Sequence, residues 1–447
     1  MAMLHLAPRF IQRTTQLSTP RISAARFGTW ARFAKQPAVA PARAPLGQAW
    51  SRHASQAAAP GAASPATHRG VAWWLFGTAG AVAGMIVLGG MTRLTRSGLS
   101  MVDWKLTGSA LPSSQAAWEA EFEKYKQFPE YRMVNSTMTV DEFKFIYFME
   151  WFHRMWGRSL GVIFMAPGAY FLAKGAIPRQ ARLPVALAGA LGAAQGAIGW
   201  WMVKSGLVER DPADRSVPRV SAYRLTAHLA AAFSIYSLLL WGGMSSLYPR
   251  GEIGPAAARA VSKVRPVAAA AAGIAALTAV SGGFVAGNDA GRAYNDWPLM
   301  AGKFVPEQYW DGKLGSRNLF ENTATVQFDH RMLAYSTLAG VMTMFIKARR
   351  APWADLPQQA RAGIMAAHIA VWGQITLGVS TLMMYVPVSL GSMHQAGALA
   401  LWSTMLWSLH GLGRGLPPTA AVATLGTAAA GAAAAAAVAG GVAQIGM

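Results

Sequence analysis

Long apolar stretches separated by short polar ones fill the chain from about residue 70 to residue 411. Eight of these stretches reach the roughly 20 residues that an α-helix needs to cross a bilayer. They lie near residues 71–91, 146–172, 183–203, 223–247, 266–287, 324–346, 362–384 and 389–411. The pattern therefore predicts an all-α membrane protein with eight transmembrane helices.

The composition favours a membrane protein over a soluble one. Length alone would suggest two or three soluble domains. However, charged residues make up only 13% of the chain, about half of the roughly 25% that is typical of soluble proteins. The chain has no cysteine, which excludes disulfides and thiolate metal sites.

The two ends of the chain differ from the rest in composition. Residues 1–69 hold eight Arg and one Lys but no acidic residue, and they are rich in Ser, Thr and Ala. This composition is typical of a mitochondrial transit peptide; the alternative is a disordered basic tail that binds anionic lipid or nucleic acid. Residues 412–447 form an Ala/Gly-rich low-complexity tail, where a ninth span has weak support.

The charges of the loops predict the topology. The loops at 174–182, 248–265 and 347–361 carry eleven Lys or Arg against two acids, whereas the other loops carry fifteen of each. The positive-inside rule places the first set on the interior side, which is the matrix of a mitochondrion, together with both termini. The net charge of +21 thus reflects targeting and topology, and it does not predict a nucleic-acid partner.

Residues 70–265 and 266–411 read as two halves of four helices each, because four features recur in the same order. The paired segments are GGMTRLTRSGLSMVDW (89–104) with GGFVAGNDAGRAYNDW (282–297), FHR (152–154) with DHR (329–331), QGAIG (195–199) with QITLG (374–378), and LTAHLAAAF (225–233) with GSMHQAGAL (391–399). Such ordered matches indicate an internal duplication. Both halves start on the same side, so the pattern predicts two pseudo-symmetric four-helix bundles in a parallel repeat.

Four of the nine histidines occupy repeat-equivalent positions: His153, His228, His330 and His394. Each lies in the first third of an even-numbered predicted span, so all four lie at similar depth near the outer face, two in each half. A single buried histidine is usually a core residue, but four in matched positions indicate function. Ionisable residues inside a membrane are costly and mark functional sites.

The six charged residues inside the predicted spans gather around these histidines. Each lies within five residues of one of the four; the six are Glu150, Arg154, Arg158, Arg224, Asp329 and Arg331. The clustering predicts one polar site in each half.

Two imidazoles facing each other in a helix bundle suit the axial ligation of haem iron. Arginine side chains such as Arg154, Arg224 and Arg331 suit the propionate carboxylates of haem. Zinc would require three or four ligands with carboxylate or thiolate support, whereas copper stays an open alternative. The direct interpretation is two bis-histidine haem sites, one in each half.

The two halves differ three residues before the first histidine, where the first half has Glu150 and the second has Gln327. A carboxylate can take up a proton or stabilise positive charge on a neighbouring carbon, whereas an amide does neither well. The first half is therefore the better candidate for catalysis. The alternative is that Glu150 only forms an ion pair with Arg154 or Arg158.

Together, these motifs resemble haem A synthase of the mitochondrial type. The resemblance covers residues 70–411 and rests on EWFHR (150–154), DHR (329–331), the second histidine of each half, and the segment GGMTRLTRSGLSMVDWKLTGSALP (89–112). Some bacterial members carry a cysteine pair in an outer loop, which this chain lacks. The Ala/Gly-rich tail lies outside the family pattern.

The resemblance implies an oxidoreductase that converts haem O to haem A by successive hydroxylations of one ring methyl group, for use in cytochrome c oxidase. It also implies that His330 and His394 ligate a haem b cofactor, and that His153 and His228 hold the substrate haem beside Glu150. The expected location is the mitochondrial inner membrane. The expected partners are a ferredoxin as electron donor, haem O synthase and cytochrome c oxidase assembly factors; a homo-oligomer stays open.

Two other functions fit part of the pattern. A dihaem electron-transfer protein of the cytochrome b type predicts two equivalent haems and no turnover of haem. A haem transporter or chaperone predicts exchangeable haem at both sites and no dependence on Glu150. Parallel repeats also occur in transporters.

Overall fold

The computed structural model describes residues 65–209, 217–248 and 251–413, all within one compact unit. The described residues form helices and loops, and their only β-type contact is an isolated bridge between Met300 and Lys303. The Ala/Gly-rich segment from 414 onward and residues 1–64 of the predicted transit peptide lie outside the described residues. The first described helix begins at Pro65, inside the segment assigned to that peptide.

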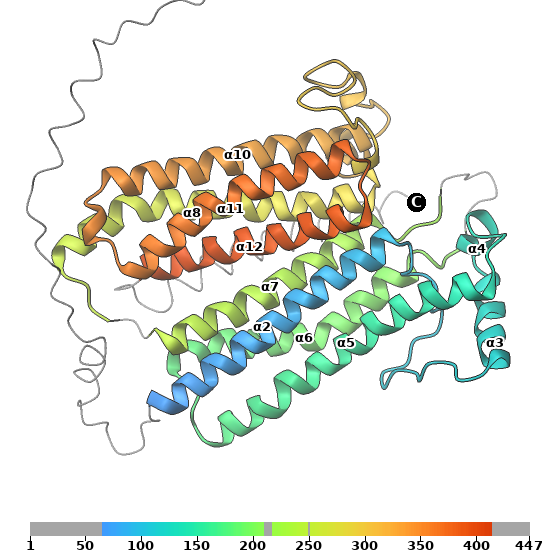
Figure 1. Ribbon diagram of the computed structural model, residues 1–447, viewed down its shortest axis with the longest axis horizontal. Helices are drawn as coiled ribbons and strands as arrows, with labels where there is room; N and C mark the ends of the chain where they lie inside the picture. The colour runs from blue at the N-terminus through green and yellow to red at the C-terminus, as the bar shows by residue number, and fades with distance from the viewer. Residues whose placement is uncertain (1–64, 210–216, 249–250, 414–447) are drawn as a thin grey trace, which may run out of the picture. The chain divides into compact units, whose positions relative to one another are not determined.

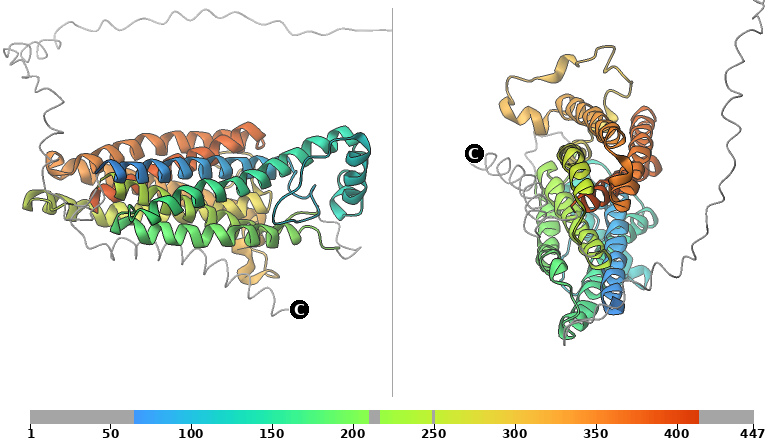
Figure 2. Two further views of the ribbon diagram at one scale, coloured as in Figure 1. Left: turned by 90° about the horizontal axis from the view of Figure 1, so that it is seen from below. Right: turned by 90° about the vertical axis from the view of Figure 1, so that its left-hand side faces the viewer.

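Eight helices of 25 residues or more make up most of the described chain (Figure 1). Each overlaps one of the eight apolar stretches predicted from the sequence. They are α2 (Pro65–Leu94), α5 (Val140–Ala173), α6 (Arg179–Lys204), α7 (Ala222–Leu247), α8 (Pro255–Gly287), α10 (Thr323–Arg350), α11 (Gln358–Met383) and α12 (Val388–Leu412). The long helices share a common direction (Figure 2).

Five of these helices, α2, α6, α7, α8 and α11, are long and apolar enough to cross a membrane by length and composition. The other three, α5, α10 and α12, carry His153, His330 and His394, and α5 and α10 also carry most of the charges in the predicted spans. Polar side chains lower the mean hydropathy of a helix. The count of eight spans therefore stays a prediction.

Local sequence explains where several helices begin. At the start of α5, the Thr139 hydroxyl accepts from the Glu142 amide while the Glu142 carboxylate accepts from the Thr139 amide, which forms a capping box. Asn322 caps α10 in a similar way. Pro255 opens α8 in the first helical turn, which its fixed φ favours. Residues 255–265 are therefore helical, and their assignment to a loop was wrong.

The eight helices pack in two groups that follow the order of the chain. In the first group α7 packs against α2 and α6, and α2 also contacts α5; in the second, α11 packs against α12, and α8 packs against α10 and α12. The groups meet where α7 contacts α8 and where α12 contacts α2 and α7. Arg93 also joins them: its Nη2 donates to the Asp289 carboxylate and to the Ala286 carbonyl, both at 2.8 Å.

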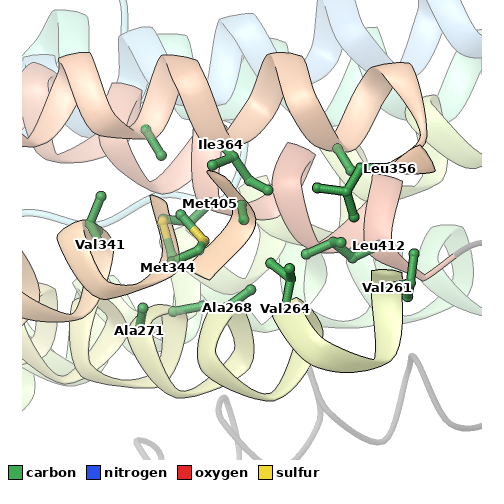
Figure 3. Packing of buried hydrophobic residues seen from close by; sticks show 14 of the residues in the cluster. Val261, Val264, Ala268, Ala271, Val341, Met344, Leu356, Ile364, Met405 and Leu412 are labelled. Atoms are coloured by element: carbon green, nitrogen blue, oxygen red, sulfur yellow. The ribbon is translucent and has the colours of Figure 1, made fainter. Parts of the chain in front are cut away.

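The largest apolar core lies in the second group, toward the helix ends that are far in sequence from His330 and His394. Figure 3 shows α8 side chains such as Val264 and Ala268 facing Met344 of α10 and Met405 of α12. Alanines on this face of α8 let the neighbouring helices approach closely. This core fixes one end of the second group, and a smaller apolar cluster of Phe284, Ala290 and Val326 lies at the other end.

The segments that follow α2 and α8 lie at the same end of the helices (Figure 1). The first contains α3 (Gln115–Lys126) and α4 (Pro129–Met133); the second contains α9 (Asn318–Glu321) and the short 3₁₀ helices η1 (Ala290–Arg292), η2 (Glu307–Tyr309) and η3 (Gly315–Arg317), while η4 (Trp353–Asp355) lies between α10 and α11. Here Glu130 of α4 is only 5% exposed and accepts a hydrogen bond from the Tyr125 hydroxyl. Burial raises its pKa from 4.5 to about 7.

The raised pKa of Glu130 predicts that the segment between α2 and α5 is more stable in acid. The folded carboxyl keeps its proton up to about pH 7, whereas the unfolded one loses it near 4.5. The contribution of this carboxyl to the free energy of unfolding is therefore complete below pH 4.5 and is lost as the pH rises through 7. Thermal unfolding in detergent should give a higher midpoint at pH 5.5 than at pH 8, and Glu130→Gln should reduce that difference. An unchanged difference in the variant would contradict the assignment.

Candidate functional site

Each of the four histidines lies against a glycine of the preceding long helix. A Cβ added to the glycine would approach the imidazole Cε1 to within 2.9–3.3 Å; the pairs are Gly89 with His153, Gly199 with His228, Gly282 with His330, and Gly378 with His394. A larger residue at these positions would push the ring away from the helix backbone by a few tenths of an ångström or more. The same contact, made four times, fixes where each imidazole lies.

In the second group the two imidazoles come together. The ring centroids of His330 and His394 are 6.5 Å apart, with an angle of 84° between the ring planes. A metal–nitrogen bond of about 2 Å on each side, plus about 1 Å from nitrogen to ring centre, separates two opposed imidazole centroids by roughly 6 Å. The observed spacing therefore fits one iron between the two rings.

In the first group His153 of α5 and His228 of α7 lie on two helices that both pack against α2. Each residue is half-buried, but its Nδ1 atom is fully buried and makes no hydrogen bond. A buried polar atom without a partner is costly. These two unsatisfied rings are the kind of group that a bound ligand would stabilise.

Two glutamines reinforce the match between the groups. Gln195 Nε2 donates to the His228 carbonyl at 2.9 Å, and Gln374 Nε2 donates to the His394 carbonyl at 3.0 Å. Gln374 Nε2 also lies 3.1 Å from Nδ1 of His394. The QGAIG and QITLG segments thus hold the backbone of the second histidine in each half.

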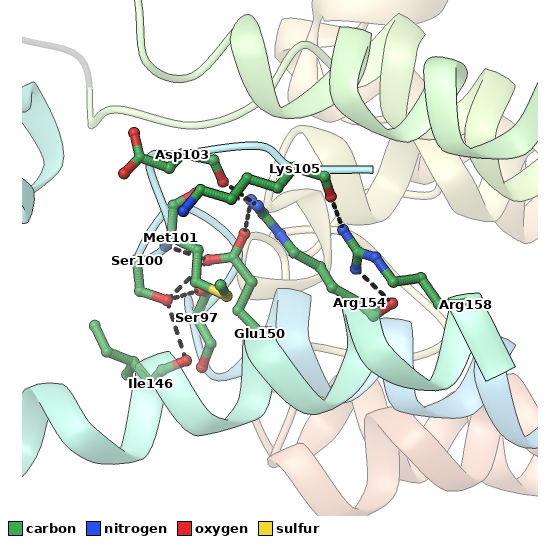
Figure 4. Close-up of polar contacts among 9 residues, drawn as sticks. All are labelled: Ser97, Ser100, Met101, Asp103, Lys105, Ile146, Glu150, Arg154 and Arg158. Atoms are coloured by element: carbon green, nitrogen blue, oxygen red, sulfur yellow. Dashed lines mark hydrogen bonds and ion pairs between the residues drawn. The ribbon is translucent and has the colours of Figure 1, made fainter. Parts of the chain in front are cut away.

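Glu150 is 2% exposed and is held by three hydrogen-bond donors (Figure 4). Arg154 Nη2 lies 2.5 Å from Oε1, while the Ser100 hydroxyl and the Met101 amide donate to Oε2 at 2.8 and 2.7 Å. Arg154 also donates to the carbonyls of Met101 and Asp103. The ion pair with Arg154 is therefore present. Through their bonds to Ser100, Met101 and Asp103, the two residues hold the segment after α2 against α5.

The second group repeats this arrangement with an amide in place of the carboxylate. Gln327 Oε1 accepts from Arg331 Nη2 at 2.9 Å, and Gln327 Nε2 donates to the Ala290 carbonyl at 2.6 Å. Arg331 also donates to the carbonyls of Leu299 and Tyr294. The arginine contacts are repeated between the groups, but Gln327 donates to its segment where Glu150 accepts from Ser100 and Met101. Of the two positions, only that of Glu150 carries a carboxylate.

The arginines predicted to bind propionates contact backbone carbonyls. Arg154 and Arg331 hold the segments after α2 and α8, as described above. Arg158 donates to the carbonyls of Lys105, Leu106 and Arg154. Arg224 donates to the Trp201 carbonyl at 2.9 Å and lies over the Trp201 ring at 4.7 Å. Contact with haem propionates stays a prediction for Arg154, Arg224 and Arg331.

The arrangement suits a prosthetic group better than a bare metal ion. Within the part of the chain that the structure describes, no three His, Cys, Asp or Glu side chains gather as a metal site. A haem iron needs only two axial ligands from the protein. Paired histidines therefore match haem and do not match the ligand count that zinc prefers.

Comparison with known proteins identifies the family. A protein-family model described as "Cytochrome oxidase assembly protein" matches residues 72–406. The chain is 52% identical over 356 residues to "Heme A synthase COX15" of Arabidopsis thaliana, covering 79% of this chain and 77% of that protein. It is 44% identical to the proteins of the same name from Homo sapiens (78% and 84% covered) and Saccharomyces cerevisiae (76% and 74%).

The chain belongs to the cytochrome oxidase assembly protein family. Residues 72–406, which the family model matches, contain all four histidines, their four glycines and Glu150. The family resemblance inferred from the sequence is therefore confirmed.

The sequence did not predict that the glycines support the imidazole rings, although Gly89 and Gly282, and Gly199 and Gly378, are aligned in the repeat. It also missed Ser281, whose hydroxyl lies 2.7 Å from Nδ1 of His330. The signal for the glycines was present in the repeat. The repeat gave no signal for Ser281, because the equivalent residue in the first half of the chain is Leu88.

Proposed function

We propose that the protein is a haem A synthase, an oxidoreductase that oxidises a methyl group of haem O to a formyl group for cytochrome c oxidase. The family match carries this proposal, since it extends from residue 72 to residue 406. The four glycine-seated histidines support it, because they provide two haem-binding positions in one chain. A dihaem electron-transfer protein would have no need for a carboxylate in one half and an amide in the other.

We propose that the eight long helices are eight spans in two pseudo-symmetric bundles, 70–265 and 266–411. The matched His–Gly and Gln–carbonyl contacts support this, since each occurs in both groups of helices. The relatives named above come from a plant, a mammal and a yeast, all organisms that have mitochondria. The proposed location is the inner membrane, with both termini in the matrix.

We assign the resident haem b to His330 and His394. The 6.5 Å ring spacing supports that assignment. When bound there, a bis-histidine haem stores and transfers single electrons. The chain's own part would be to hold the rings of His330 and His394 at this spacing, which Gly282 and Gly378 permit.

The substrate haem O is assigned to His153 and His228, whose Nδ1 atoms lack partners. The donors Arg154, Ser100 and Met101 hold the Glu150 carboxylate in one orientation. A fixed, buried carboxylate can stabilise positive charge developing on a nearby carbon or accept its proton. The proposed electron donor is a ferredoxin. Haem O synthase and cytochrome c oxidase assembly factors are the proposed protein partners.

The function can be tested by complementation. The full chain is expressed in yeast that lacks its own haem A synthase, and haem A is measured in extracted mitochondrial pigment together with respiratory growth. We expect both to return. Correctly targeted protein that restores neither would contradict the proposed activity.

Gly378 gives a local test of the haem b site. A methyl group at this position would approach the His394 ring to 3.0 Å, so Gly378→Ala should displace the ring and weaken haem binding by about tenfold or more. Gly373→Ala on the same helix is the matched control, because a Cβ there meets nothing within 4 Å. Haem content per chain, measured by absorbance, should fall in the first variant only. An equal loss in both variants would contradict the ring-support role.

A further inference from the structure

The first axial histidine of each half has a different environment on its Nδ1 side. In the second half, the Ser281 hydroxyl oxygen lies 2.7 Å from Nδ1 of His330 and 2.8 Å from the Thr278 carbonyl oxygen. Ser281 directly precedes Gly282, the glycine on which the same imidazole rests. Two neighbouring residues of α8 therefore set both the place and the orientation of this ring.

These contacts also indicate which ring nitrogen carries the proton. The Thr278 carbonyl can only accept, so the Ser281 hydroxyl donates to it. The hydroxyl oxygen is then the acceptor for Nδ1–H of His330. Nε2 is left with its lone pair, which is the form of imidazole that binds a metal.

The first half lacks this chain of hydrogen bonds. The offset of 193 residues between Gly89 and Gly282 places Leu88 opposite Ser281. A leucine side chain cannot accept a hydrogen bond, and Nδ1 of His153 is buried without a partner. The two halves thus share the glycine support but not the hydroxyl.

We propose that Ser281 is a positioning residue that holds His330 as a permanent axial ligand, and that Leu88 keeps the equivalent His153 a weaker, exchangeable ligand. This inference rests on the proposed haem sites and extends them. A hydrogen bond from Nδ1–H to an acceptor makes imidazole a more basic ligand, and such outer contacts tune affinity and potential. One half is thereby built to retain its haem and the other to release a product.

The test of Ser281 uses full-length protein purified in detergent, with haem content and the midpoint potential of the bound haem b as readouts. Ser281→Ala should lower haem affinity roughly tenfold and shift the potential upward, because a less basic imidazole stabilises ferric iron less. Ser281→Thr keeps a hydroxyl and should restore both values. Ser262→Ala, an exposed serine of the same helix, is the matched control.

Loss of haem from Ser281→Ala with retention in Ser281→Thr would also support the hydroxyl contact. The same haem affinity and potential in wild type, Ser281→Ala and Ser281→Thr would overturn it. If His330→Ala and His394→Ala leave the haem b of the protein unchanged, the proposed haem site itself fails. The two failures are therefore distinguishable.

Leu88→Ser provides the reciprocal experiment in the first half. A hydroxyl opposite His153 should slow the transfer of haem O or haem A from the protein to apomyoglobin, while the haem b potential stays unchanged. Leu88→Ala, which shortens the side chain without adding an acceptor, is the control. Transfer that is equally fast in wild type and Leu88→Ser would overturn the assignment of Leu88.

Discussion

His330→Ala is expected to abolish the haem b signal of the purified protein. The substitution removes one of two rings whose centroids lie 6.5 Å apart. One axial ligand then remains, and the loss should exceed the roughly 10–100-fold effect of changes to outer contacts. The bis-histidine absorbance bands of the reduced protein and the extracted haem b provide the measurement.

The matched control for this loss is His368→Ala. His368 is a half-buried histidine of α11 that stacks on Phe345 at 4.1 Å and lies outside the repeat-equivalent set. Its removal should leave haem b in place. Equal haem b in wild type and His330→Ala would contradict the assignment of the second half.

Glu150→Gln is expected to leave haem b bound and to lower the conversion of haem O by about 100-fold, a typical contribution of one acid–base group. The second half shows that an amide fits this position, since Gln327 accepts from Arg331 as Glu150 does from Arg154. Arg154 keeps its bonds to the carbonyls of Met101 and Asp103. The variant removes the charge but sets an amide NH2 against a donor, either Arg154 or the Met101 amide, so conversion is expressed per bound haem b and the thermal midpoint is measured beside it.

The reciprocal change, Gln327→Glu, controls for an effect of altered charge at this depth. It should leave haem A formation per bound haem b unchanged, because the second half performs no oxidation in this account. The rate is referred to haem b content because the carboxylate loses the bonds of Gln327 to the Ala290 and Ala293 carbonyls. Haem O, the alcohol intermediate and haem A are separated by chromatography after extraction. Normal haem A formation by Glu150→Gln would reduce Glu150 to its structural role beside Arg154.

The sequence predicted the parts of this molecule that depend on periodic or repeated residues. The eight apolar stretches all became long helices, and the four matched histidines all lie against matched glycines. The ion pair of Glu150 with Arg154 was also predicted as an alternative, since residues four apart share a helix face.

Contacts that depend on the course of a loop could not be predicted. Arg154 and Arg331 donate to the segments after α2 and α8, whose paths no periodicity fixes. Hydropathy was also an incomplete guide, because α5, α10 and α12, which carry three of the four histidines, are not among the five helices that are long and apolar enough to cross a membrane. The partner of His330, Ser281, lies on another helix and becomes visible only when the two pack together.

The most direct test of the account is the pigment content of the wild-type protein. The full chain is purified in detergent from cells that make haem O, and its extracted haems are separated by chromatography and identified by mass. The account predicts haem b together with haem O and some haem A or its alcohol intermediate. Two haem b per chain, unchanged by the supply of haem O, would contradict it and favour a dihaem electron-transfer protein.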